Sequence, residues 1–149
     1  MSWLLIPFII QALAISVDEY VFHIKRGLPR WERIGHPLDT LSVLICLVLV
    51  LVIPFSASAL KWFIGLSIFS CLMVTKDEFV HKHHCPASEH WLHALLFLNH
   101  PILLTCTGLM WKSADPTWSL FLMGQALFVS VFFLYQVIYW NFIWKSETE

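Results

Sequence analysis

The chain has 149 residues, of which 58% are hydrophobic and 13% are charged, and its formal net charge is −1. Its mean hydropathy of +0.73 excludes an ordinary soluble domain, because so few polar residues cannot cover a globule of this size. The sequence has no basic stripe interleaved with aromatic residues, so nucleic-acid binding has no support. We expect an all-α integral membrane protein with a single transmembrane domain over residues 1–149.

Apolar runs of about 20 residues predict five transmembrane helices, because this length crosses a hydrocarbon core near 30 Å. The expected spans cover about residues 3–24, 32–54, 60–81, 88–111 and 118–142. The first run is expected to be retained and not cleaved as a signal peptide, since no positive charge precedes it and Asp18 and Glu19 follow it. The four cysteines form no pattern typical of a disulfide framework.

A short pattern occurs twice in the same order. Residues 18–21 read Asp-Glu-Tyr-Val and residues 77–80 read Asp-Glu-Phe-Val, and each is followed by P-x-x-E-x-x-x-H, at residues 29–36 and 86–93. The recurrence predicts two repeated helical hairpins, at about 3–57 and 60–114, which form a four-helix bundle. The helix at 118–142 lies outside the repeat.

The basic residues gather at one side of the predicted membrane domain. Seven of the nine lysines and arginines fall in the first loop, in the third loop or after the last helix: Lys25, Arg26, Arg30, Arg33, Lys76, Lys82 and Lys145. Cytoplasmic loops carry such an excess. The N-terminus is therefore expected outside, and the C-terminus and the histidine-rich loops are expected on the cytoplasmic face.

The repeated motif has the composition of a metal site. Residues four apart share a helix face, so Glu32 points with His36 and Glu89 with His93. A pseudo-two-fold axis would bring both pairs together with the carboxylates that end the preceding helices. The expected metal ligands are Glu19, Glu32, His36, Glu78, Glu89 and His93, with His23 and His81 as further candidates. Asp18 and Asp77 are expected either to orient an imidazole or to replace the adjacent Glu as ligands.

This ligand inventory resembles that of the ferritin-like di-metal carboxylate bundles, in which two helices give one Glu each and two give a Glu-x-x-His pair. The resemblance covers the inventory alone, and the pair here is Glu-x-x-x-His. It implies a site for two divalent cations, which would also neutralise carboxylates that repel one another in a medium of low dielectric constant. Mixed oxygen and imidazole ligands favour iron, with zinc or manganese as alternatives.

Two further residues are candidates for a catalytic role. His100 lies two turns beyond His93 on the same helical face and is expected to act in a substrate pocket or a proton relay. Asp39 follows His36 by three residues and could accept an imidazole N–H. The alternatives are a buried histidine bonded to a neighbouring helix and, for the helix-end residues, solvated groups at the membrane boundary. Tyr135, Gln136 and other polar groups of the last helix are expected to form interhelical hydrogen bonds.

These expectations favour a membrane-embedded di-iron oxidoreductase. It would use O₂ to oxidise or desaturate a lipid-like substrate and would receive electrons from a cytoplasmic donor. The alternatives are a zinc-dependent membrane hydrolase, a metal carrier or sensor, and a structural subunit of a larger complex.

Overall fold

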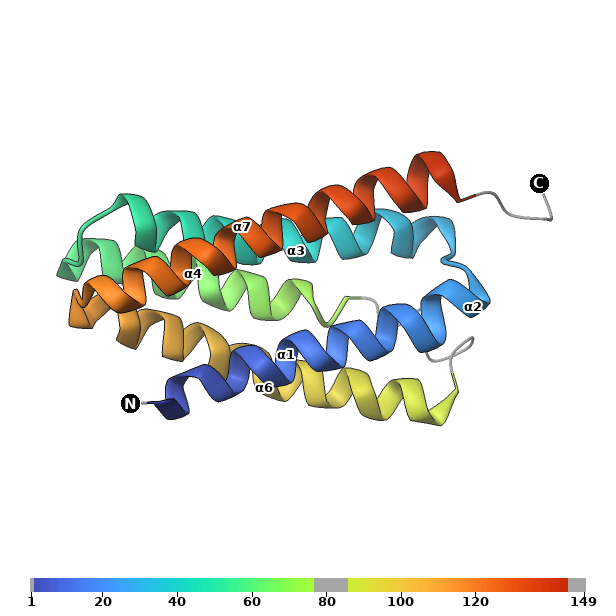
Figure 1. Cartoon of the computed structure of the whole chain (residues 1–149), viewed down its shortest axis with the longest axis horizontal. Coiled ribbons are helices and arrows are strands. Elements are labelled where there is room, and N and C mark those ends of the chain that lie inside the picture. Colours follow the sequence, from blue (N-terminus) through green and yellow to red (C-terminus); the bar gives the residue numbers. More distant parts are fainter. Residues whose placement is uncertain (1, 77–85, 145–149) are drawn as a thin grey trace.

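The computed structural model describes residues 2–76 and 86–144, and every regular element among them is helical. The helices run side by side along one long axis (Figure 1). Four helices are long and apolar enough to cross a membrane: Trp3–Arg26, Arg30–Val52, Ala87–Ser113 and Pro116–Ile143. The fifth, α4 (Ala57–Met73), is apolar but has only 17 residues. The expected all-α chain with five helices is confirmed.

The first long helix is not uniform. It consists of a 3-10 turn η1 (Ser2–Leu5), α1 (Ile6–Val17), a π-helical segment η2 (Asp18–His23) and a last turn α2 (Ile24–Arg26). The helix stops at Gly27, whose φ of +77° is accessible to glycine but costly for other residues. The π-helical segment widens the turn that carries three of the candidate residues.

Two of the helices begin in the same way. Pro29 caps α3 (Arg30–Val52) and Pro86 caps α6 (Ala87–Ser113), both in extended conformation. A proline suits this position because the first N–H groups of a helix have no intrahelical partner. Glu32 and Glu89 then lie in the first turn, where the helix dipole favours a carboxylate. The two P-x-x-E-x-x-x-H copies thus have the same local structure, whereas the second Asp-Glu copy lies outside the described residues.

The third helix differs from its expected span of 60–81. It begins at Ala57, after the Ser56 side chain accepts a hydrogen bond from the Ala59 N–H at 3.1 Å. It ends at Met73 and gives way to a turn over residues 74–76. The Thr75 hydroxyl donates to the Leu72 carbonyl at 2.8 Å, which competes with continued helix. Lys76 then reaches α3, where its ammonium donates to both carboxylate oxygens of Asp39 at 2.7 Å.

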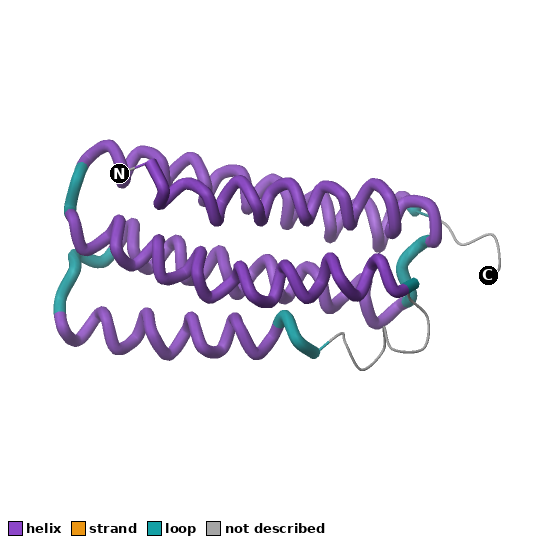
Figure 2. Tube along the Cα trace, turned by 90° about the horizontal axis from the view of Figure 1, so that it is seen from below, coloured by secondary structure: helices purple, strands orange, loops and turns teal. Residues whose placement is uncertain are grey.

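The last helix is part of the bundle. Asp115 caps α7 (Pro116–Ile138) by accepting a hydrogen bond from the Thr117 N–H at 2.8 Å, and a second π-helical segment, η3 (Tyr139–Ile143), ends it. In space, α1 packs on α6, α6 packs on α4, α4 packs on α3, and α3 packs on α7. Figures 1 and 2 show these helices nearly parallel, with the N-terminus and the C-terminus at opposite ends.

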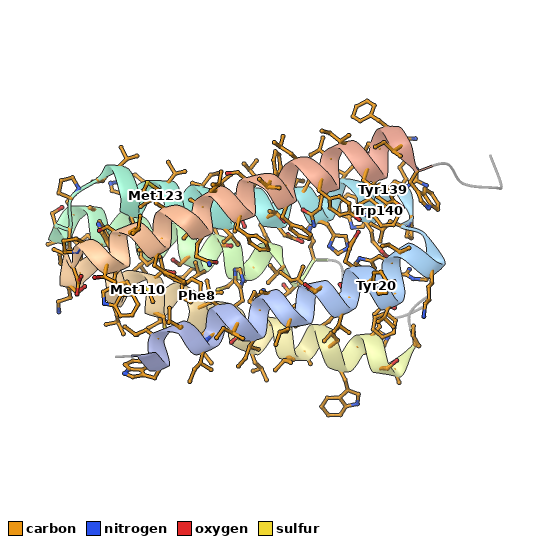
Figure 3. All side chains as sticks on the ribbon, in the orientation of Figure 1. Phe8, Tyr20, Met110, Met123, Tyr139 and Trp140 are labelled. Atoms are coloured by element: carbon orange, nitrogen blue, oxygen red, sulfur yellow. The ribbon has the colours of Figure 1, made fainter. Side chains whose placement is uncertain are left out.

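The two halves of the bundle have different interiors. The half near the N-terminus holds an apolar core that includes Leu4, Phe8, Leu47, Leu104 and Met110, and Figure 3 labels Phe8 and Met110 there. The half near Gly27 and the end of α7 holds buried ionisable groups instead. On the outside, many large apolar side chains are exposed. The molecule therefore has polar groups inside and apolar groups outside.

The Gly27 turn gives the first prediction. A Cβ at this position would overlap the ring of Trp144. The combination of φ +77° and ψ +163° is also nearly confined to glycine and costs an L-residue about 1–3 kcal/mol. Gly27→Ala is expected to lower the melting temperature of the detergent-solubilised protein. Gly124→Ala is the matched control, because nothing lies within 4 Å of its added Cβ and alanine favours a helix. Equal melting temperatures for the two variants would contradict this account of the turn.

Candidate metal centre

Four buried side chains converge at one end of the bundle. Asp18 and His23 come from η2, and Glu89 and His93 come from the first two turns of α6. Each offers one ligand atom, and these four atoms lie within 4.8 Å of one another. None of the four residues is more than 6% exposed. This group, named the four-residue cluster below, could hold a metal ion.

The distances within the four-residue cluster are those of ligands around one ion. His23 Nε2 lies 3.3 Å from Asp18 Oδ2 and 3.8 Å from Glu89 Oε1, and His93 Nε2 lies 3.3 Å from Asp18 Oδ1. Four donor atoms at about 2.1 Å from a tetrahedral metal are separated by about 3.4 Å. The three separations are close to this value, so the cluster could hold a divalent cation.

The orientation of His23 is fixed by Glu19. His23 Nδ1 lies 3.2 Å from Glu19 Oε2, and a carboxylate can only accept there, so Nδ1 carries the proton in this contact. The other Glu19 oxygen accepts hydrogen bonds from the Tyr135 hydroxyl at 2.6 Å and from the Trp140 indole N–H at 2.9 Å. Figure 3 shows Trp140 on the inner side of the α7 end, facing the first helix. Glu19 is thus held by three donors from two helices.

In this orientation Nε2 of His23 faces carboxylate oxygens of Asp18 and Glu89. Among the described residues, His23 Nε2 and Glu89 Oε2 are buried and have no hydrogen-bond partner. Lone pairs that meet in a buried site repel unless a cation lies between them. A metal ion could be coordinated by these atoms together. A metal-bound histidine usually donates its other ring N–H to a carboxylate, as His23 does to Glu19.

The π-helical turn explains why Asp18, and not Glu19, joins the four-residue cluster. In an α-helix, Glu19 and His23 would share a face because they are four residues apart. In η2 the repeat is five residues, as the hydrogen bond from the Ile24 N–H to the Glu19 carbonyl indicates. Asp18 and His23 are five apart, so both reach the same point. Glu19 also stays near His23, as the residue that orients it.

A second group of ligand atoms adjoins the first. His23, Glu32 and His36 have one ligand atom each within 4.8 Å of one another, and the rings of His23 and His36 are 4.9 Å apart. Between the two groups lies Arg26, whose Nη2 donates to Glu89 Oε1 at 2.8 Å and to Glu32 Oε2 at 3.3 Å. A side-chain cation therefore lies between the two glutamates of the repeated motif.

A cavity of about 120 Å³ borders the four-residue cluster on one side. Asp18, His23 and His93 line it, and so do His36, Asp39 and His100. His100 Nε2 lies 3.0 Å from Ser70 Oγ, which is 2.7 Å from Ser42 Oγ. Asp39, which was expected to accept from an imidazole, forms the ion pair with Lys76 described above.

The structure thus brings together most of the residues that the sequence indicates. His23, Glu32, His36, Glu89 and His93 all lie in the two groups, whereas Glu78 and His81 lie outside the described residues. Asp18 occupies the place expected for Glu19, as the alternative weighed from the sequence allows. Tyr135 and Gln136 form interhelical hydrogen bonds, as expected: Tyr135 donates to Glu19 and Gln136 accepts from Thr40. The sequence analysis missed the roles of Arg26 and Trp140. The charge of Arg26 was used only to predict the membrane orientation, and no signal in the sequence distinguished Trp140 from the other aromatic residues near the helix ends.

Comparison of the chain with protein-family models, with curated proteins and with solved structures found no match. The candidate site is therefore interpreted from its own geometry.

Asp18 and Glu19 are expected to respond differently to substitution. Asp18→Asn removes a ligand charge and should lower the metal affinity more than about 100-fold, whereas Glu19→Gln loosens His23 and should lower it about 10–100-fold. Asp115→Asn is the matched control at the other end of the bundle, because asparagine caps a helix as well as aspartate. The metal affinity of all three variants is measured as the amount of metal that each retains after dialysis against increasing concentrations of a chelator. A weaker effect of Asp18→Asn than of Glu19→Gln would contradict the assignment.

Removal of Arg26 should make the fold depend on metal. Arg26→Met leaves Glu32 and Glu89 without the cation between them, which should destabilise the metal-free protein by about 3 kcal/mol. Added Mn²⁺ or Zn²⁺ should then raise the melting temperature more in this variant than in the wild type, because the ion supplies the missing positive charge. Arg30→Met, an exposed arginine of the same charge class, is the control. Similar metal-induced shifts in both variants would count against the bridging role.

Proposed function

We propose that the protein is a membrane-embedded metalloenzyme, which holds a divalent transition metal in the four-residue cluster and oxidises a lipid-like substrate. The observation that carries this proposal is the His23 imidazole, whose Nδ1 is occupied by Glu19 while its Nε2 faces two carboxylates without a hydrogen bond. Only a cation or an additional proton makes that arrangement favourable. A metal ion there could also be coordinated by Glu89 and His93.

The distribution of side chains supports insertion into a bilayer. Leu13, Val52, Trp62, Leu98 and Leu127 are each more than 60% exposed and come from all five helices. Such a surface is unfavourable in water and suits lipid. The polar groups, by contrast, are buried between helices, where membrane proteins place them.

The basic residues support the expected orientation. Lys25 and Arg26 end α2, and Arg30 and Arg33 lie in the first turn of α3, at the end of the bundle that carries the four-residue cluster. Lys76 pairs with Asp39, which lines the cavity beside the cluster. Lys61 and Lys112 lie in the first turns of α4 and the last turn of α6, which are near the other end (Figure 1). The positive-inside bias then makes the first end cytoplasmic and the N-terminus external. In this orientation the metal would be close to a cytoplasmic electron donor.

The cavity beside the cluster supports an enzyme more than a carrier. It would give the metal an open side, where O₂ or a substrate could bind, and His36, Asp39 and His100 would supply proton donors and acceptors on its walls. A carrier needs a polar path to the opposite membrane face. The other half of the described bundle is instead filled by the packed apolar core.

Iron is the proposed metal, and a single ion in the four-residue cluster has the strongest support. His23 belongs to both ligand groups and Arg26 lies between them, so a second ion in the adjoining group would require Arg26 to move away. With Glu and His ligands and an open position, iron could activate O₂.

A zinc-dependent hydrolase is the second candidate. A set of two imidazoles and two carboxylates also suits zinc, which would activate a water molecule for attack on an ester or amide.

Elemental analysis of the detergent-purified protein, combined with absorption spectroscopy, tests the proposal. We expect about one iron per chain and near-ultraviolet or visible absorption from the ferric form, both lost in a His23→Gln, His93→Gln double variant. Stoichiometric zinc without visible absorption would favour the hydrolase. A protein that purifies and folds without any transition metal, and binds none when it is added, would refute the metal centre.

A further inference from the structure

A second cavity adjoins the one beside the four-residue cluster. It has a volume of about 130 Å³ and lies between α1, α3, α6 and α7. The two cavities share Gln11, Ile15, Thr40, Val43, His100 and Phe132 as lining residues. The second cavity is named the inner pocket below. It continues from the candidate metal site toward the middle of the bundle.

The inner pocket is mainly apolar. Phe8, Leu47, Leu103, Val129 and Phe132 are among its lining residues, and Gln11, Thr40 and His100 give it a polar side toward the four-residue cluster. Two of these polar groups are fixed by neighbours: Gln11 Oε1 accepts from Asn99 at 2.9 Å, and Thr40 donates to Gln136 at 2.6 Å. Gln125 of α7 adds a further polar group to this mainly apolar lining.

The inner pocket reaches the outer surface between α1 and α7. These helices touch near one end through the rings of Phe8 and Phe121, with centroids 5.0 Å apart, and near the other end through the Tyr135–Glu19 hydrogen bond. Between these contacts, the pocket-lining residues Ser16 and Phe128 are exposed. Around them the surface is apolar, with Leu13, Leu127 and Val131 all more than half exposed.

The geometry points to an opening between α1 and α7 through which one unbranched hydrocarbon chain enters from the bilayer, with its reacting carbon placed in the cavity beside the four-residue cluster. This inference rests on the proposed function and names its substrate class. Size supports it, because a cavity of about 150 Å³ holds a benzene-sized ligand. The two cavities, at about 120 and about 130 Å³, are slightly smaller than that, so each could hold only a narrow chain segment and not a fused ring system.

Photolabelling tests the opening. The probe is a phospholipid whose unbranched acyl chain carries a diazirine, added in small amount to wild-type protein in nanodiscs, and the adducts are mapped by peptide mass spectrometry. Adducts on the α1 and α7 residues that line the inner pocket are expected to disappear when excess unlabelled unbranched fatty acid is added. Cholesterol, which has a fused ring system, should not compete.

Two substitutions on the same helix provide the matched comparison. Ala12 lines the inner pocket, whereas Leu13 points outward and is 63% exposed. Ala12→Phe should reduce the competable labelling at least about tenfold, since displacing even two buried methylene groups is worth this much. Leu13→Phe should leave it unchanged. Bound metal and melting temperature, measured on the same samples, show whether each variant folds and keeps its metal site.

Three results would overturn the opening. One is labelling spread evenly over the lipid-facing helices without competition, and another is equal competable labelling in Ala12→Phe and the wild type. The third is competable labelling confined to the larger apolar groove of about 630 Å³ between α4 and α6, which none of the candidate metal ligands lines. Competable labelling of the inner pocket in a protein that binds no metal would refute the proposed metal centre and leave the opening supported.

Discussion

The structure depends on how buried negative charge is neutralised at one end of an apolar bundle. Asp18, Glu32 and Glu89 are almost completely buried, and Glu19 is partly buried. Carboxylates in such a place repel one another and strongly disfavour ionisation unless cations or N–H and O–H donors surround them. The guanidinium of Arg26 supplies a positive charge between Glu32 and Glu89. Glu19 is stabilised by three hydrogen-bond donors, which are Tyr135, Trp140 and His23. The rest of the charge, around His23 and Asp18, is where the proposed metal would lie.

The two π-helical segments make this arrangement possible. In η2, the wide turn brings Asp18 and His23 to one point and leaves Glu19 beside them. In η3, Trp140 is the buried residue, and it donates its indole N–H to Glu19. Trp144, just beyond η3, contacts the Gly27 turn and lies under the guanidinium of Arg33 at 4.4 Å. The last helix therefore contacts both η2, which carries candidate ligands, and the Gly27 turn that follows it. It belongs to the candidate site together with the repeated segments.

The proposed activity follows from the contrast between the two halves of the bundle. One half is a packed apolar core that would resist the passage of ions and water. The other half contains the four-residue cluster, the cavity beside it and His100, which contacts Ser70. A polar site that is continuous with an apolar pocket would suit the proposed chemistry on a hydrocarbon chain.

The sequence by itself determined the helical composition, the approximate spans and the local starts of α3 and α6, because apolar run length, Pro29, Pro86 and the four-residue spacing act over one or two turns. It also indicated five of the residues that meet at the candidate site. Only the tertiary structure decided that Asp18 takes the place expected for Glu19, that Arg26 lies between the two glutamates, and that Lys76 pairs with Asp39. These features depend on a widened turn and on charges that approach one another from different helices. A periodic pattern along one segment of the chain predicts neither a widened turn nor the approach of charges from different helices.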